Sequence, residues 1–228
     1  MATTVLTPVV DVLPEPEKDT PLSRVWAWSW PKLLAILIVL AALCRPAETL
    51  SPRAAAFAKW SWAVVAAIAI DNSPPVAFYH PEWAIAERAI LHAMFDALQD
   101  AYDPARMTRP TFIGHNIVSF DLRFLFQRAV LNGVLPPSII PFNARPWDTT
   151  VFDTMTAWAG VGNRVSLDKL CSAFGIAKKG SEIGDDIDGS KVWDYVRTGR
   201  IADVVEYCKG DVERVRAIHR RMTFAEAA

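Results

Sequence analysis

Residues 112–121, FIGHNIVSFD, place a histidine, an asparagine and an aspartate directly after a short apolar stretch. The apolar stretch predicts a strand at Thr111–Gly114, with a helix starting a few residues later. His115 and Asn116 then lie at the carboxyl end of the strand, where open α/β sheets place their ligands. Asp121 falls in the first turn of the helix. Taken alone, an Asp at this position only complements the helix dipole.

A second pair of polar side chains lies near the end of the chain, in the sequence YCKGD. Tyr207 and Asp211 are four residues apart, so they are neighbours on one face of a predicted helix at Ala202–Met222. They border the apolar stripe of this helix, formed by Val204, Cys208, Val212, Val215 and Met222. By itself the pair of Tyr207 and Asp211 also fits an ordinary helix surface. Together with the polar residues of FIGHNIVSFD, it indicates a functional site.

HNIVSFD followed by YCKGD resembles the second and third motifs of the DEDD 3′-5′ exonucleases, which have a ribonuclease H-like fold. The sequence is most similar to the proofreading exonucleases of family B DNA polymerases and their stand-alone relatives, from about Trp62 to Phe224. Tyr207, four positions before Asp211, is typical of the tyrosine subclass. The resemblance implies an α/β fold with a mixed central sheet flanked by helices.

The resemblance also implies a reaction and a site. The reaction is hydrolysis of phosphodiester bonds at the 3′ end of single-stranded DNA or frayed ends, with RNA as an open alternative. Two divalent cations, Mg²⁺ or Mn²⁺, would be held by carboxylates, the ligands that hard cations prefer. Asp121 and Asp211 would be metal ligands, and Tyr207 would orient the attacking water. Asn116 and His115 would contact the substrate strand, with Phe120 near the terminal base.

The first acidic motif of the family, D-x-E, has no clear counterpart. Between Thr20 and Ile70 the only acidic residue is Glu48. The nearest candidate is VVDVLPEPE, where a strand ending near Val10 would make Asp11 a metal ligand. Leu13 then stands where the glutamate is expected, so Glu15 or Glu17 would have to reach back. This departure leaves open a catalytically impaired nucleic-acid-binding module of the same fold.

Composition divides the chain into an atypical apolar segment, residues 1–60, and an exonuclease-like domain, residues 61–224. The apolar run Leu33–Leu43 is better explained by a buried strand or helix than by a membrane span. A membrane-associated protein using residues 25–44 stays a third alternative, although we expect no stable membrane partner. Strands and helices exposed to solvent need polar faces, and Leu33–Leu43 offers none. We therefore expect the segment of roughly residues 13–63 to be divergent or mis-read and to pack poorly on the domain.

The overall charge and the cysteines exclude some classes of protein. The formal net charge is −1, so no global basic field attracts nucleic acid or anionic membranes. Three scattered cysteines form no metal motif and no even disulfide set, which suits a reducing compartment. We therefore expect a cytoplasmic protein.

Hydrophobic periodicity and turn residues predict the remaining elements. Strands are expected at 62–70 and 76–80, and helices at 81–101, 119–132, 151–160, 166–174 and 192–197. The apolar side of the helix at 119–132 is assigned to Phe120, Leu122, Leu125 and Phe126. Three further aspartates, Asp148, Asp153 and Asp168, are expected to cap or pair locally.

Overall fold

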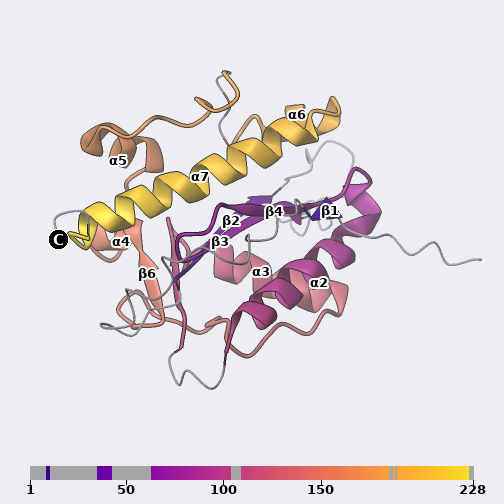
Figure 1. Cartoon of the computed structure of the whole chain (residues 1–228), viewed down its shortest axis with the longest axis horizontal. Helices are drawn as coiled ribbons and strands as arrows, with labels where there is room; N and C mark the ends of the chain where they lie inside the picture. The colour runs from indigo at the N-terminus through magenta and orange to yellow at the C-terminus, as the bar shows by residue number, and fades with distance from the viewer. Residues whose placement is uncertain are drawn as a thin grey trace, which may run out of the picture.

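The structure is a computed structural model that describes residues 9–10, 35–42, 63–103, 109–184, 187 and 189–225. One sheet lies between two layers of helices (Figure 1). Its strands are β1 (Val9–Val10), β2 (Ala35–Ala42), β3 (Ala63–Ile70), β4 (Val76–Tyr79), β5 (Thr111–Gly114) and β6 (Val151–Asp153). The described helices are α2 (Trp83–Ala101), α3 (Asp121–Asn132), α4 (Thr154–Ala159), α5 (Leu167–Phe174), α6 (Val192–Arg197) and α7 (Ile201–Met222).

The sheet is mixed, with the strand order β1-β4-β3-β2-β5-β6. Strands β2, β5 and β6 run parallel to one another, whereas β1, β4, β3 and β2 pair antiparallel. Helix α7 crosses one face of the sheet, and α2 and α3 lie on the other (Figure 1). The predicted mixed central sheet flanked by helices is therefore confirmed.

The side chains of strand β3 pack into both hydrophobic cores, one on each face of the sheet. Val65, Ala67 and Ala69 pack into the core on the α7 side. Ala66 and Ile68, which alternate with them, pack into the core beneath α2 and α3. Successive side chains of a strand point to opposite faces, so a strand covered on both sides reads as a continuous apolar run.

The apolar run at Leu33–Leu43 has the same explanation. Its described part, Ala35–Ala42, is strand β2, which lies between β3 and β5 near the middle of the sheet. Ile36 pairs with Ile70 on one side and with Phe112 on the other. The expectation of poor packing is thus wrong for Ala35–Ala42, because a central strand needs no polar face. None of the described helices is both long and apolar enough to cross a bilayer.

Two local predictions also need correction. Residues 151–160 were expected to be helical throughout, but Val151–Asp153 form β6 because they pair with β5, and the helix starts at Thr154. Phe126 was assigned to the buried side of α3 but is 42% exposed, whereas Phe124 is buried. The Phe126 ring contacts Phe142 on the loop after α3, with 5.4 Å between ring centroids.

Candidate active site

The turn between β5 and α3 is held by a residue from the neighbouring strand. Asp153 Oδ1 accepts a hydrogen bond from the Asn116 backbone N–H at 2.9 Å, and Asp153 Oδ2 accepts one from Val118 N–H at 3.4 Å. Asn116 has a φ of 63°, a left-handed conformation that Asn tolerates better than most residues. Asp153 also caps α4, as predicted. Its role across the sheet was missed because it depends on the pairing of Gly114 with Asp153.

His115 is engaged by the protein at both ring nitrogens. Its Nε2 lies 2.9 Å from the Val165 carbonyl oxygen and its Nδ1 lies 3.0 Å from Thr154 Oγ1. A carbonyl only accepts, so Nε2 carries the proton and donates it to Val165. Burial lowers the pKa of His115 below the usual histidine value of 6.5. The expected contact of His115 with a substrate stays a prediction, and its observed role is to hold α4 and the loop before α5.

Asp121 lies in the first turn of α3, as predicted, and it is buried; the helix itself starts at Asp121 rather than at residue 119. Phe120, beside it, stacks on Phe124 with 6.0 Å between ring centroids. The pKa of the buried thiol of Cys208, on α7, is raised by burial and by the negative charges of Asp211 and Asp121. Helix α7 packs against β5, so the helix that carries Asp211 lies beside the strand that leads to Asp121.

Asp211 is the centre of a charged cluster on α7. Its Oδ2 lies 3.2 Å from Lys179 Nζ, and its Oδ1 lies 3.2 Å from Arg214 Nη1. Lys179 Nζ also donates a hydrogen bond to Tyr207 Oη at 3.1 Å. Tyr207 and Asp211 are both buried, so the pair predicted at the border of the apolar stripe is enclosed.

Arg214 connects this cluster to the loop after α5. Its guanidinium donates to the carbonyl oxygens of Ala177 and Lys178 at 3.0 and 2.7 Å and forms an ion pair with Glu182. Gly210 makes room for Glu182, because a Cβ at this position would lie 2.6 Å from the Glu182 carboxylate carbon. A glycine inside a helix costs about 1 kcal/mol relative to alanine, and at this position it leaves the space that the Glu182 carboxylate and the Arg214 guanidinium occupy.

Sequence reasoning did not identify Lys179, Arg214 or Glu182. Lys179 and Glu182 contact Tyr207 and Arg214 across 28 and 32 residues of the chain, and these contacts depend on the path of the loop at 177–182. Arg214 lies only three residues after Asp211 on α7, and this i, i+3 spacing was the one signal available in the sequence. Lys178 and Lys179 are adjacent in the sequence, and nothing in their spacing distinguishes the one that contacts Asp211.

The charges of the cluster shift its pKa values. Burial raises the pKa of Asp211, and the nearby Lys179 and Arg214 only partly offset this effect. Burial and the Asp211 charge raise the pKa of Tyr207. Burial opposes the charge of Lys179, but Asp211 and Tyr207 outweigh it and raise its pKa. Around neutral pH, Tyr207 is therefore a neutral phenol held by an ammonium group.

The described residues fit a divalent-metal site only in part. Asp121 and Asp211 supply the oxygen ligands that Mg²⁺ prefers. However, no group of three or more His, Cys, Asp or Glu side chains suited to a metal ion occurs among the described residues. Each carboxylate oxygen of Asp211 also contacts a cationic side chain. A complete two-metal centre would need further carboxylates from outside the described ranges.

The first acidic motif was expected on a strand ending near Val10. Val9–Val10 forms β1, but it pairs with β4 at the edge of the sheet, and three strands separate it from β5. The strand beside β5 is β2, whose last residues, Val39–Ala42, are all apolar. Asp11, Glu15 and Glu17 lie outside the described residues, so the metal-binding role of Asp11 stays a prediction.

Comparison with known proteins confirms the resemblance to the exonuclease family. Residues 82–227 match the model of a family described as "Predicted 3'-5' exonuclease related to the exonuclease domain of PolB". No curated protein matches the chain. The fold is similar to that of the family B DNA polymerase from the hyperthermophilic archaeon Pyrobaculum calidifontis, with a TM-score of 0.60 and 17% sequence identity. The match covers 85% of this chain and 25% of the polymerase, and it confirms the ribonuclease H-like fold.

Proposed function

Because the chain belongs to the family of predicted 3′-5′ exonucleases related to the exonuclease domain of PolB, we propose that it removes nucleotides from the 3′ end of single-stranded DNA. Family membership supports a nuclease function in general. The observation that carries the more specific proposal is the location of the two motifs. Asp121 starts α3 just after β5, α7 packs against β5, and Tyr207 lies one helical turn before Asp211 on α7.

Asp121 and Asp211 would hold Mg²⁺ or Mn²⁺, with Asp11 as the predicted further ligand. When bound, such cations neutralise charge on the scissile phosphate and acidify the attacking water. The resident side chains have complementary tasks. Tyr207 stays protonated because its pKa is raised, so its hydroxyl orients water rather than removing a proton. Lys179 fixes the position of this hydroxyl relative to Asp211.

Substrate contacts are proposed for the turn between β5 and α3. The Asn116 side chain would contact the last nucleotides of the strand, and the Phe120 ring would stack on the terminal base. Stacking of this kind contributes about 1–3 kcal/mol per base. The turn is suited to this task because Asp153 fixes its backbone at two positions.

A second candidate function is binding of a 3′ end without hydrolysis. Two observations favour it. Both oxygens of Asp211 are already paired with Lys179 and Arg214, and the carboxyl end of β2 offers only apolar residues. In this alternative, Lys179 and Arg214 supply the positive charge that cations would otherwise bring.

One assay tests the proposed function against this alternative. A 5′-labelled single-stranded DNA is incubated with the full chain in Mg²⁺, Mn²⁺ or EDTA, beside an RNA of the same sequence. We expect a ladder of products shortened from the 3′ end with either metal, and none in EDTA. Asp211→Asn should abolish the ladder. The matched control is Asp194→Asn, since Asp194 is exposed and pairs only locally with Arg197.

The possible results separate the two functions. Binding of the DNA without shortening in either metal would refute the nuclease proposal and support the binding module. Shortening that persists in Asp211→Asn would show that Asp211 is not part of the active site. Equal rates on RNA and DNA would remove the preference for DNA but leave the reaction in place.

A further inference from the structure

A pocket of about 650 Å³ lies at the end of the sheet opposite to the candidate active site. It is bordered by Arg109, which precedes β5, by Thr149 and Thr150, which precede β6, and by the loop after α3. The active-site residues follow the same two strands. Thr111, at the start of β5, and His115, just past its end, are four residue steps apart, which is about 13 Å at ~3.3 Å per residue. The pocket is thus distinct from the site around Asp211.

The walls of the pocket combine an apolar surface with polar groups. Ile140, Pro141 and Phe142 form the apolar wall, and Trp147 stands at the edge with 66% of its surface exposed. Trp147 makes no ring contact with any aromatic side chain in the described part of the chain. A concave site with apolar walls and a few polar groups is the usual form of a small-ligand site. Trp147 therefore has a large aromatic surface available to a ligand.

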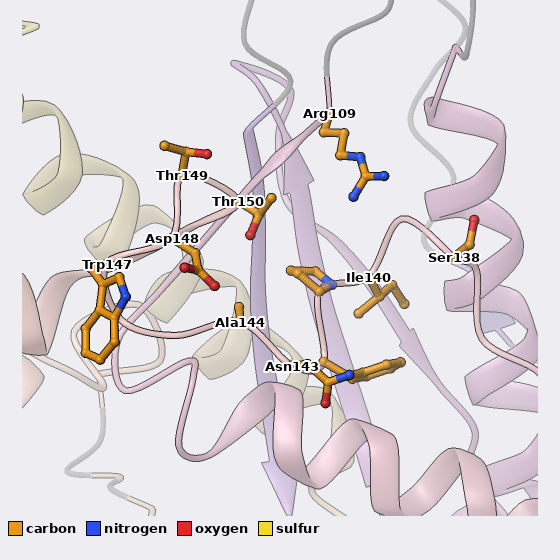
Figure 2. A pocket seen from close by; sticks show the side chains of 11 residues that line it. Arg109, Ser138, Ile140, Asn143, Ala144, Trp147, Asp148, Thr149 and Thr150 are labelled. Atoms are coloured by element: carbon orange, nitrogen blue, oxygen red, sulfur yellow. The ribbon is translucent and has the colours of Figure 1, made fainter.

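Arg109 supplies a cation to this pocket. Its guanidinium points into the pocket from the start of β5 (Figure 2). Among the residues that the structure describes, Arg109 has no hydrogen-bond or ion-pair partner. This contrasts with Arg128, Arg214 and Arg216, each of which pairs with a carboxylate. The charge of Arg109 is consequently available to an anionic group.

Asp148 adds an acceptor to the same space. One of its oxygens, Oδ2, accepts a hydrogen bond from the Arg145 backbone N–H at 2.8 Å, which orients the carboxylate. Figure 2 shows the Asp148 carboxylate directed into the pocket, between Trp147 and Ile140. A carboxylate repels a bare anion but accepts a hydrogen bond from a hydroxyl group. The pocket therefore suits a ligand that carries an anion, a hydroxyl and an aromatic ring together.

We propose that this pocket binds a nucleotide. Its phosphate would lie on Arg109, whose planar guanidinium matches two phosphate oxygens. Its base would stack on Trp147, and a sugar hydroxyl would donate to Asp148. The nucleotide is either a free mononucleotide or one unit of a single strand that passes the pocket. This inference goes beyond the proposed exonuclease function and does not depend on it.

The test measures binding by calorimetry with the full chain in EDTA, so that no metal-dependent hydrolysis occurs. The two probes are AMP, for a free nucleotide, and a 12-nucleotide oligo(A) with a blocked 3′ end, for a strand. Arg109→Ala should weaken binding of at least one probe about tenfold or more, the usual value of a charged hydrogen bond. Trp147→Ala should weaken the same probe about five- to hundredfold through lost stacking. Both side chains are exposed, so neither variant should disturb folding.

Matched controls are available on the same surface and elsewhere. Arg145→Ala removes an exposed arginine from the same loop that does not line the pocket. Trp158→Ala removes an exposed tryptophan on α4. Both controls should change the affinity by less than about twofold, as expected for residues outside the contact. Asp211→Asn should leave AMP binding unchanged, which separates this pocket from the candidate active site.

The outcome also identifies the source of the nucleotide. Binding of AMP that depends on Arg109 and Trp147 supports a site for a free nucleotide. Dependence on these residues for the oligonucleotide alone supports a site for a passing strand. If neither probe is weakened by Arg109→Ala and Trp147→Ala, the proposal is wrong.

Discussion

The two faces of the sheet each bury a charged cluster, and the two clusters are built differently. On the α2 and α3 face, Glu87 pairs with Arg128: Arg128 Nε donates to Glu87 Oε1 at 2.6 Å, and Nη2 donates to Oε2. Asn132 also donates to Glu87 Oε2 at 3.1 Å. On the α7 face, the single carboxylate of Asp211 is shared between Lys179 and Arg214, and Lys179 also contacts a tyrosine.

This difference separates a structural contact from a candidate active site. A bidentate Arg–carboxylate pair satisfies both partners and ties two helices together. The Asp211 cluster instead places a carboxylate, an ammonium and a phenol at a helix that packs against β2 and β5. Ligands of open α/β folds bind at the carboxyl ends of such parallel strands. We therefore expect variants in the first cluster to change stability and variants in the second to change activity.

Asp211→Asn should have the largest effect on activity. It removes a charge but keeps the shape of the side chain, and charge stabilisation by a metal site is worth several kcal/mol. We expect the rate of DNA shortening to fall by at least about a hundredfold. Glu87→Gln, assayed on the folded fraction, should stay within about twofold of the wild-type rate. Similar losses in both variants would erase the distinction between the two clusters.

Glu87→Ala should have the largest effect on stability. It leaves the Arg128 guanidinium, whose side chain is only 11% exposed, without its carboxylate, and breaking a buried pair costs about 3–5 kcal/mol. Urea unfolding followed by circular dichroism measures the change. Replacing both partners with Met should recover most of the loss, because two apolar side chains leave no charge buried. A double variant as unstable as Glu87→Ala would mean that packing, rather than charge, is lost.

The sequence predicted those parts of the molecule that have a local signature. The helical spacing of apolar residues located α2 and α7, and the i, i+4 spacing brought Tyr207 beside Asp211. For the apolar run that contains β2, the prediction left both a buried strand and a buried helix open. A run without polar residues has no hydrophobic periodicity to distinguish them. Lys179 could not be found at all, because its contact with Asp211 is set by the loop after α5.

Tyr207→Phe should have an intermediate effect on activity. The ring stays in place and only the hydroxyl that accepts from Lys179 is lost. We expect turnover to fall about tenfold, less than the about 10²–10⁴-fold contributed by a group that transfers a proton, because Tyr207 only orients the water. DNA affinity, measured in EDTA, should be nearly unchanged. An equal loss of affinity and turnover would identify Tyr207 as a substrate contact instead.

The smallest expected effect is a pH dependence of stability that arises from His115. Burial lowers the pKa of His115 in the folded protein, so folding favours the neutral ring. The stabilising contribution is complete above the unfolded value of 6.5 and is lost as the pH falls through the folded pKa. The difference in Tm between pH 7.5 and 5.5 should therefore be smaller in His115→Gln than in the wild type. His219→Gln is the comparison, because burial also lowers the pKa of His219.

The position of β2 has a consequence for dividing this protein into fragments. The region that matches the exonuclease family starts at residue 82, after β1, β2, β3 and β4 in the chain. A fragment cut at that boundary would keep only β5 and β6 of the six-stranded sheet. The edge of β5 that normally pairs with β2 would then be open, and an unpaired edge is a template for self-association. Expression of the domain alone should therefore include residue 35 onward, although the recognisable motifs begin much later.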